Sequence, residues 1–456
     1  MNLIIKSPKS IYILLILYFT SHCSFDNKTG IWQDGKKILI EESKVEKTEE
    51  KLTTLFKENA IFNEEKDLDS KKKLDSEKVI NITRWTAKFH NDENNLPNVY
   101  YQNKKEKILK TSKLSSDKNL SNSLFYGNNI IFYNNRGTIF IYSIASKKKI
   151  FEYNFYKKRF KKTKKYINLV YKNGIIYASD NLGYVYAINI ANKKVIWAKN
   201  SGIPFRSNIK IADNSLFLAN QENKIYSINI ANGKQNWQFS SNETFLKSDF
   251  QNNIIIDKAK NNVFFFNTNG ELYSIDYYTK KINWVLNLKN SYFKSDTDLF
   301  EGLPLVMHED YIVASTGNTI QNINSLSGTV VWNKAIHTSV KPIISKNKIF
   351  ITTKNNLLVC LDLITGKIIW SKNIVTELLS VDTKYDSWKT GAVKSLAIVN
   401  NQIYLFTKNG YLITFNYNGG EITSLLRITK SKIKEEPFFV NGYLHLIEKN
   451  RIVIYE

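Results

Sequence analysis

Side chains able to carry out chemistry are few in this chain, and their spacing matches no catalytic or metal-binding motif. Four histidines follow the first thirty residues, and no two stand at the short spacing that brings two ligands to one metal ion. They are His90, His308, His337 and His445. Cys360 lies in an apolar run with no partner cysteine nearby, so we expect it to be a small core side chain. The G-x-S-x-G, G-x-x-x-x-G-K-[ST] and G-x-G-x-x-G motifs are absent, and we predict no catalytic residue, metal or cofactor.

One acidic pair resembles the beginning of a calcium-binding loop. Asp296 and Asp298 alternate as such ligands do, but Phe300 occupies the next ligand position and the required glycine is missing. The remaining carboxylates are scattered among turns, where solvated side chains are the rule, so no acid–base pair is predicted.

The architecture that would position any site is set by a repeat. A short phrase ending in tryptophan recurs at intervals of 38 to 48 residues. A period in the forties with several short strands per unit is typical of a β-propeller. We expect the tryptophans to pack between units, although they could instead dock a planar quinone on the axis. The five copies end at Trp197, Trp237, Trp284, Trp332 and Trp370.

The copy between residues 214 and 239 shows what one unit contains. An apolar run at 215–219 is followed by a turn, and residues 224–230 then carry apolar groups at alternate positions, the period of a half-buried strand. Asn232 and Gly233 form a hairpin turn pair before the closing strand with Trp237. Each unit therefore predicts a four-stranded antiparallel blade.

Superposed units predict an all-β, eight-bladed propeller, with seven blades as the alternative. Phe151 takes the tryptophan position in the first unit and Ser424 in the seventh. The eighth unit, 442–455, has two strands, so a strand from the N-terminal side must complete it, because a ring cannot leave a strand edge open. We expect residues 82–87 to be that strand. The units begin near Gly127, Asn173, Asn214, Asn261, Glu309, Lys346, Asn400 and Asn441.

The net charge of +24 raises the question of nucleic-acid binding. The lysines, however, are scattered through predicted turns, and the densest run, at 157–165, lies between two units. We interpret them as solvated surface charge and predict no nucleic-acid partner. The hydrophobic content of 43% is sufficient for a large all-β core.

The N-terminus predicts export and attachment to a membrane. Lys6 and Lys9 precede nine apolar residues at 11–19, too few to span a bilayer but suitable for a signal peptide. Cys23 follows as in a bacterial lipobox, although Thr20 and His22 depart from that pattern, and an ordinary secretory signal is the alternative. We therefore predict a signal peptide at 1–22, a charged and mostly disordered tether at 23–78 that is acylated at Cys23, and a propeller at 79–456.

The T-G-K-x-x-W phrase resembles the repeat of pyrroloquinoline-quinone-like propellers. Together with the lipobox and tether, it makes the chain similar to the BamB family of outer-membrane lipoproteins. The resemblance implies a non-enzymatic scaffold of the β-barrel assembly machinery on the periplasmic face of the outer membrane. It implies binding to BamA, and possible help to nascent β-barrel clients. In type, Ile203, Phe205 and Arg206 match one partner-binding loop of that family, and Asp296 and Asp298 resemble a second.

A quinone-dependent dehydrogenase of the periplasm is the alternative function, because such enzymes share the repeat. They are usually longer, and they carry an adjacent-cysteine disulfide and calcium-holding acidic residues. With two cysteines at positions 23 and 360, this sequence cannot form that disulfide.

Overall fold

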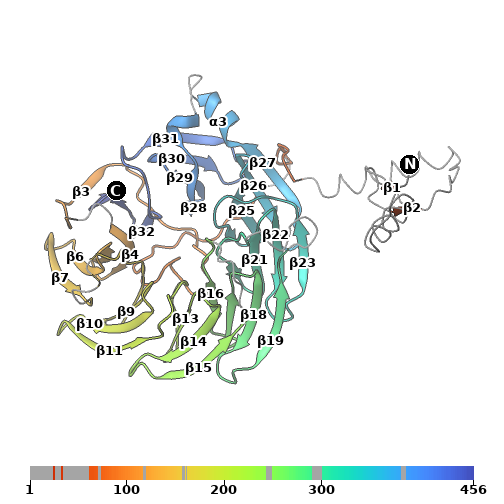
Figure 1. Ribbon diagram of the computed structural model, residues 1–456. Helices are drawn as coiled ribbons and strands as arrows, with labels where there is room; N and C mark the ends of the chain where they lie inside the picture. The colour runs from red at the N-terminus through yellow and green to blue at the C-terminus, as the bar shows by residue number, and fades with distance from the viewer. Residues whose placement is uncertain are drawn as a thin grey trace, which may run out of the picture. The chain divides into compact units, whose positions relative to one another are not determined.

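The computed structural model describes residues 24–25, 32–33, 61–69, 73–116, 120–156, 160, 162–242, 249–289, 300–381 and 387–456. The chain divides into two units, Met1–Ala60 and Ile61–Glu456. In the first, β1 (Ser24–Phe25) pairs with β2 (Trp32–Gln33). The second is a ring of eight four-stranded antiparallel sheets, which confirms the prediction of an eight-bladed propeller (Figure 1).

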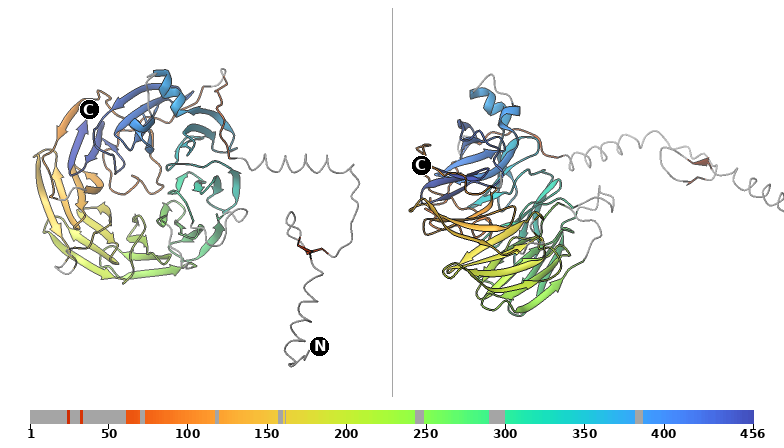
Figure 2. Two further views of the ribbon diagram at one scale, coloured as in Figure 1. Left: turned by 45° about the horizontal axis from the view of Figure 1, so that its top comes forward. Right: turned by 60° about the vertical axis from the view of Figure 1, so that its left-hand side comes forward.

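Blades 1 to 4 each consist of four consecutive strands, the first near the axis and the fourth at the rim (Figure 2). Blade 1 contains β4 (Leu120–Tyr126), β5 (Asn129–Asn134), β6 (Thr138–Ser143) and β7 (Lys148–Asn154). Blade 2 contains β8 (Ile167–Lys172), β9 (Ile175–Asp180), β10 (Tyr184–Asn189) and β11 (Lys194–Asn200). Blade 3 contains β12 (Lys210–Ala212), β13 (Ser215–Ala219), β14 (Lys224–Asn229) and β15 (Gln235–Ser240). Blade 4 contains β16 (Asn253–Asp257), β17 (Asn262–Phe266), β18 (Glu271–Asp276) and β19 (Ile282–Asn287).

Blades 5 to 7 repeat this order, and two short helices follow the sixth blade. Blade 5 contains β20 (Val306–His308), β21 (Tyr311–Thr316), β22 (Thr319–Asn324) and β23 (Val330–Lys334). Blade 6 contains β24 (Ile343–Ser345), β25 (Lys348–Thr352), β26 (Leu357–Asp362) and β27 (Ile368–Asn373). The helices are α3 (Ile374–Val381) and α4 (Ser387–Thr390). Blade 7 contains β28 (Val393–Val399), β29 (Gln402–Thr407), β30 (Tyr411–Asn416) and β31 (Ile422–Arg427).

The middle strands are buried on both faces, because each blade packs between two others. In β14, the four residues from Ile225 to Ile228 are all buried, including Ser227, so burial extends beyond the alternate positions that the sequence predicts. The outer strands differ: in β11, Trp197 is the one buried residue. The units expected from the sequence begin at the turn between first and second strands. There, left-handed backbone at Asn173, Asn261 and Asn400 fits the tolerance of asparagine for positive φ.

Each tryptophan of the repeat packs against the next blade, as predicted. The Nε1 of Trp332 on β23 donates a hydrogen bond to the carbonyl of Leu363 in blade 6, at 2.8 Å. A Cβ on Gly366 would lie 2.6 Å from this indole, so glycine is required for such close approach. Because these tryptophans lie on outer strands, they do not face the axis, and they are not positioned to dock a quinone there. Trp197, Trp237 and Trp284 donate in the same way to the carbonyls of Ile230, Tyr277 and Ser325.

Blade 8 closes the ring with strands from both ends of the propeller. It contains β32 (Phe438–Val440), β33 (Tyr443–Glu448), β34 (Arg451–Tyr455) and, at the rim, β3 (Lys107–Lys110). Closure by terminal strands is therefore confirmed, but the expected strand at 82–87 is wrong. That segment lies at the inner edge instead, where Trp85 exchanges two backbone hydrogen bonds with Phe125 of β4, because Ile82 and Trp85 are apolar side chains that become buried.

Residues 80–101, here called the strap, follow the inner edge of the ring from blade to blade and hydrogen-bond to all eight blades. The backbone N–H of Ile256 donates to the carbonyl of Asp92 at 3.0 Å, and that of Met307 to Glu93 at 3.0 Å. These bonds fall at the carboxyl-terminal ends of the inner strands, so the strap lies at one end of the axial channel. The other blades are bonded through Phe125, Tyr171, Lys210, Ile344, Ile398 and Asn441.

The chain upstream of the strap is already part of the propeller unit. Lys66 exchanges two backbone hydrogen bonds, 2.9 and 2.8 Å long, with Ser371 on the outer strand β27. Leu74 is buried, and its N–H donates to the Asn418 side chain at 3.0 Å. The compact unit thus begins at Ile61, upstream of the boundary at residue 79 that composition predicts. Within the described ranges, no helix has the length and apolar character needed to cross a membrane.

Candidate functional site

One end of the ring carries the segments that link the outer strand of each blade to the inner strand of the next. We call this end the connection face, and it lies opposite the strap. The segment 201–209 joins β11 to β12 and contains the first predicted partner-binding loop. Its backbone is fixed on both sides: the Phe205 N–H donates to the Asp180 carbonyl at 2.9 Å, and the Arg206 N–H donates to the Ala219 carbonyl at 3.0 Å.

The three predicted contact residues of this loop differ in exposure. Ile203 and Arg206 are half-buried. Phe205 is only 3% exposed, and its ring packs edge-on against Tyr226 at 5.8 Å between centroids. The expectation that Phe205 presents its ring to a partner therefore needs correction: the ring anchors the loop from beneath, while Ile203 and Arg206 reach the surface.

A buried carboxylate supports the same loop. The Asp180 side chain accepts a hydrogen bond from the Tyr156 hydroxyl at 2.6 Å and from the backbone N–H groups of Leu182 and Tyr184 at 2.8 and 2.9 Å. Burial raises the pKa of Asp180, and these hydrogen bonds act in the opposite direction. Because the Asp180 carbonyl accepts a hydrogen bond from the Phe205 N–H, this network fixes the backbone of the loop.

The second predicted loop lies in the connection between β19 and β20. Asp296 and Asp298 are outside the described residues. Phe300, just beyond them, is 8% exposed and packs edge-on against Phe250 and Phe266, both at 5.5 Å. Cys23 and the predicted signal peptide at 1–22 also lie outside the described residues.

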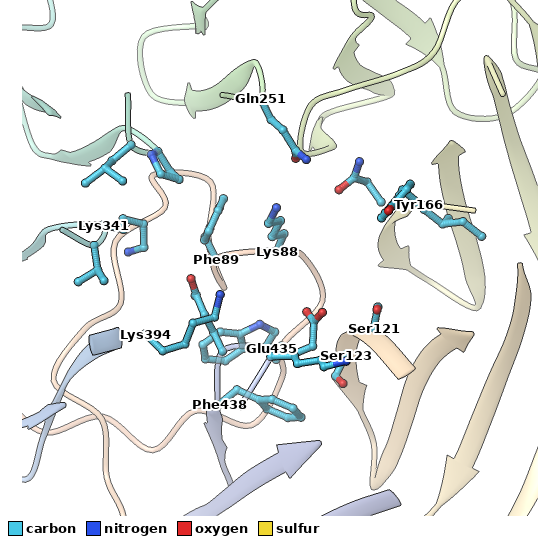
Figure 3. Close-up of a pocket in the computed structure, with 18 of the residues that line it drawn as sticks. Lys88, Phe89, Ser121, Ser123, Tyr166, Gln251, Lys341, Lys394, Glu435 and Phe438 are labelled. Atoms are coloured by element: carbon cyan, nitrogen blue, oxygen red, sulfur yellow. The ribbon is translucent and has the colours of Figure 1, made fainter. Parts of the chain in front are cut away.

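At the centre of the connection face is a cavity of about 450 Å³, here called the axial cup (Figure 3). Trp85, Lys88 and Phe89 of the strap form its floor, and inner-edge residues of several blades form its wall. Four of its lining side chains are basic and two are acidic. They are Lys88, Lys341, Lys394, Lys434, Glu435 and Glu436.

The lysines at the floor of the cup are held in an apolar setting. Lys88 Nζ lies 5.1 Å from the Phe89 ring centroid, and Lys341 Nζ lies 5.8 Å from it while donating to the Asn94 carbonyl at 2.9 Å. Desolvation lowers the pKa of Lys88, against the attraction of Glu436 and Glu435. Desolvation also lowers the pKa of Lys341 to about 8. Among the described residues, no ion pair involves Lys88 or Lys341.

The histidines and the cysteine of the described residues lie apart from one another. His445 is buried between Phe438 and Phe125, and Cys360 is fully buried in blade 6, where burial raises the pKa of its thiol. His308 Nε2 lies 3.9 Å from Glu77 Oε1, away from the other histidines. Across the described ranges, no three His, Cys, Asp or Glu side chains come together in a way that could hold a metal ion.

Comparison with known proteins shows which family has this architecture. A profile described as outer membrane protein assembly factor BamB matches residues 158–372 and 254–455, which together span well over half of the chain. The chain belongs to the BamB family. The crystal structure of BamB from Moraxella catarrhalis is similar over 77% of this chain and 99% of that one, with a TM-score of 0.60 and 12% identity. No curated protein sequence matches the chain.

The same fold occurs in enzymes. Quinohemoprotein alcohol dehydrogenase from Comamonas testosteroni has a TM-score of 0.60 at 9% identity, covering 82% of this chain and 80% of its own. A europium-containing methanol dehydrogenase has a TM-score of 0.59 at 11% identity, covering 80% of this chain and 89% of its own. At such identities the likeness shows the fold alone, so the functional argument must come from the BamB family match and the site.

Proposed function

We propose that this chain is a non-catalytic scaffold of the outer-membrane β-barrel assembly machinery. In this role it binds a BamA-like protein and assists the folding and insertion of β-barrel proteins. Membership of the BamB family is the observation that carries the proposal. A propeller whose blades are all bonded to one strap suits this role, because a rigid ring presents its connection loops in fixed positions.

The residues of the axial cup do not fit the alternative of a quinone-dependent dehydrogenase. Such an enzyme needs acidic ligands for a metal ion beside the quinone, and the described residues bring no such group together. The cup instead gathers four lysines, and the repeat tryptophans lie on outer strands away from it. We therefore derive no redox step for this protein.

The partner-binding surface that we propose centres on Ile203 and Arg206, with Asp296 and Asp298 on a second connection. An aliphatic side chain and an arginine on a loop with fixed backbone make a suitable interface hot spot. Phe205 has a positioning role beneath them. Because the backbone of the loop is already fixed, binding a partner does not carry the entropy cost of ordering it.

A double variant, Ile203→Ala with Arg206→Ala, tests this surface. We expect it to weaken binding to the purified periplasmic domains of BamA by about tenfold to a hundredfold, since two hot-spot residues are removed. Ile196→Ala with Arg427→Ala is the matched control, because it makes the same two truncations on outer strands. If both double variants bind BamA as tightly as the unchanged protein, the loop is not the contact.

We further propose that the protein is held at the periplasmic face of the outer membrane by lipid on Cys23. Several acyl chains give essentially permanent attachment, since each buried methylene contributes about 0.8 kcal/mol. Cys23→Ser should release the protein into the soluble periplasmic fraction and abolish incorporation of labelled fatty acid. A Cys360→Ser variant serves as the control, because that thiol is buried in blade 6. Retention of Cys23→Ser in the membrane fraction would exclude lipid on this cysteine as the anchor.

A further inference from the structure

Three lysines reach the axial cup from parts of the chain that are far apart in the sequence. Lys88 belongs to the strap, Lys341 precedes β24 of blade 6, and Lys394 lies on β28 of blade 7. Each of these side chains is half-buried and lines the cavity of about 450 Å³, so each keeps some exposed surface. Figure 3 shows the three lysines around Phe89. The fold therefore gathers cations at one cavity.

The hydrogen-bonding capacity of these ammonium groups is largely unused. Among the described residues, Lys88 and Lys394 donate no hydrogen bond and form no ion pair. Lys341 donates one hydrogen bond, to the Asn94 carbonyl at 2.9 Å. Because an ammonium group carries three N–H donors, each of the three lysines keeps at least two donors for water or for a ligand in the cavity.

The lining of the cup has an excess of two positive charges. Lys434 and Glu435 are neighbours in the chain and have opposite signs, so their effects largely cancel. Desolvation is the main cause of the lowered pKa of Lys88, Glu436 and Glu435 act against it, and Lys394 lowers that pKa further. The charged groups that remain are Lys88, Lys341 and Lys394 on one side and Glu436 on the other.

The charges beside the cup do not cancel this excess. Lys210 donates a hydrogen bond to the Asn91 carbonyl of the strap, and its pKa, lowered to about 7 mainly by desolvation, also responds to Lys258, Asp92 and Glu93. Lys258 Nζ forms an ion pair with Asp92 Oδ2 at 2.5 Å. This group contains two lysines and two acidic residues, so the positive potential of the cup is not offset from there.

A phosphate dianion suits both the charge and the donors of the cup. Its two negative charges match the excess, and its oxygen atoms can accept hydrogen bonds from ammonium groups on different sides. A single carboxylate would leave one positive charge uncompensated. A nucleic-acid strand needs a track of cations along a surface, and not a cluster at one cavity.

The cavity is larger than a bare phosphate ion, so it also has room for a small organic group attached to the phosphate. The amide side chains of Asn168 and Gln251 line the same cavity and form no hydrogen bond among the described residues. Figure 3 shows Gln251 and Lys394 on opposite sides of Lys88 in this view. These amides are suitable partners for hydroxyl groups of such a ligand.

We propose that the axial cup binds a small molecule through a phosphate dianion held by Lys88, Lys341 and Lys394. The phosphate is either the free ion or the end group of a small phosphate ester. This inference goes beyond the proposed function, which concerns a folded BamA-like partner at a different set of residues.

Isothermal titration calorimetry on the whole mature protein tests the proposal at pH 7.5 and constant ionic strength. The probes are inorganic phosphate, glucose 6-phosphate, glucose and acetate. We expect at least one of the two phosphates to bind at least about tenfold more tightly than glucose and acetate. Tighter binding of glucose 6-phosphate would support a phosphate ester as the ligand, and binding of inorganic phosphate at least as tight would support the free ion. No binding of either phosphate up to about 10 mM would overturn the proposal.

Matched lysine variants separate this site from general attraction by a basic protein. Lys88→Gln with Lys394→Gln should weaken phosphate binding at least about tenfold, whereas Lys194→Gln with Lys234→Gln, at exposed positions, should leave it unchanged. An equal loss in both pairs would refute the site. If the first pair does not fold, Lys394→Gln alone replaces it, with an expected loss of about threefold or more.

A charge variant with the opposite expected sign completes the test. Glu436→Gln removes the acidic group that opposes the lysines, and its side chain is exposed, so the fold should be retained. We expect phosphate to bind about threefold or more tightly to this variant, because the positive potential of the cup increases. Unchanged or weaker binding would contradict the proposed position of the phosphate. BamA binding measured on the same variants distinguishes failure here from failure of the proposed function.

Discussion

Replacing Asn94 would test whether the strap holds the blades together. This side chain is fully buried, and its Nδ2 donates to Asn253 Oδ1 and to the Leu305 carbonyl, both at 3.1 Å. Removing the side chain loses two hydrogen bonds of about 1 kcal/mol each and leaves the Leu305 carbonyl without this donor, at a further cost of about 1–3 kcal/mol. The Oδ1 atom of Asn94 is buried and has no hydrogen-bond partner among the described residues. Removing this unpaired atom is favourable and offsets part of the loss in stability. We expect Asn94→Gly to lower the free energy of unfolding by about 2 kcal/mol.

The backbone at this position adds a second, separable effect. Asn94 has a φ of 57°, which glycine adopts freely, so Asn94→Ala should cost about 1 kcal/mol more than Asn94→Gly. Urea unfolding followed by tryptophan fluorescence measures both variants, with Asn347→Ala at an exposed site as the control. A change below about 0.5 kcal/mol for Asn94→Gly would refute the idea that the strap stabilises the ring.

Three further predictions address packing, pH and surface charge. Gly366→Ala should destabilise the protein by about 2 kcal/mol, seen as a lower thermal midpoint, because its Cβ would lie 2.6 Å from the Trp332 ring; an unchanged midpoint would contradict this geometry. Burial lowers the pKa of His445 from 6.5 to about 3, so the unfolded state binds the proton first and stability falls as the pH drops below 6.5. Between pH 7.5 and pH 5, the free energy of unfolding of the unchanged protein should therefore fall by about 2 kcal/mol more than that of His445→Phe. Parallel pH profiles of the two proteins would disprove this. Lys372→Met removes an ion pair with Asp67, whose side chain is 85% exposed, and should cost no more than about 0.5 kcal/mol in urea unfolding; a loss above about 1.5 kcal/mol would show that this contact secures the upstream segment.

The blades could be predicted from the sequence because the closing strands of five of them carry a tryptophan. Trp332 buries its ring against the next blade and donates its Nε1–H to a carbonyl there, so the same phrase recurs at the ends of blades that pack in this way. The closing strand of blade 8 gave no comparable signal. β3 reads K-I-L-K and is exposed at three of its four positions. The segment around Trp85 was instead expected to be the closing strand, but it lies at the inner edge of the ring.

The site was less predictable, because its residues are assembled from distant segments. Lys88, Lys341 and Lys394 belong to the strap, blade 6 and blade 7, and in the sequence they are indistinguishable from the solvated lysines of turns. The loop at 203–206 was singled out by its residue types, and its role remains a proposal. The burial of Phe205 could not be predicted, because it depends on backbone hydrogen bonds of the loop to Asp180 and Ala219. A signal was present in the strap, since Asn91, Asn94, Asn95 and Asn98 form an asparagine-rich run, a composition suited to bonding with many strand edges.

The strap decides what the axis of this ring can do. In an open channel, the inner strand ends would leave space through the ring, and a ligand could bind at either face. Here residues 80–101 bond to every blade at one end, and Trp85, Lys88 and Phe89 of this segment line the axial cup. The same bonds join blades that are far apart in the sequence, so the loop at 203–206 and the cup are held in one rigid frame. A fold shared with enzymes here has a cup at its axis whose lining includes four lysines and two glutamates, so the chemistry of this site is decided by its own residues and not by the fold.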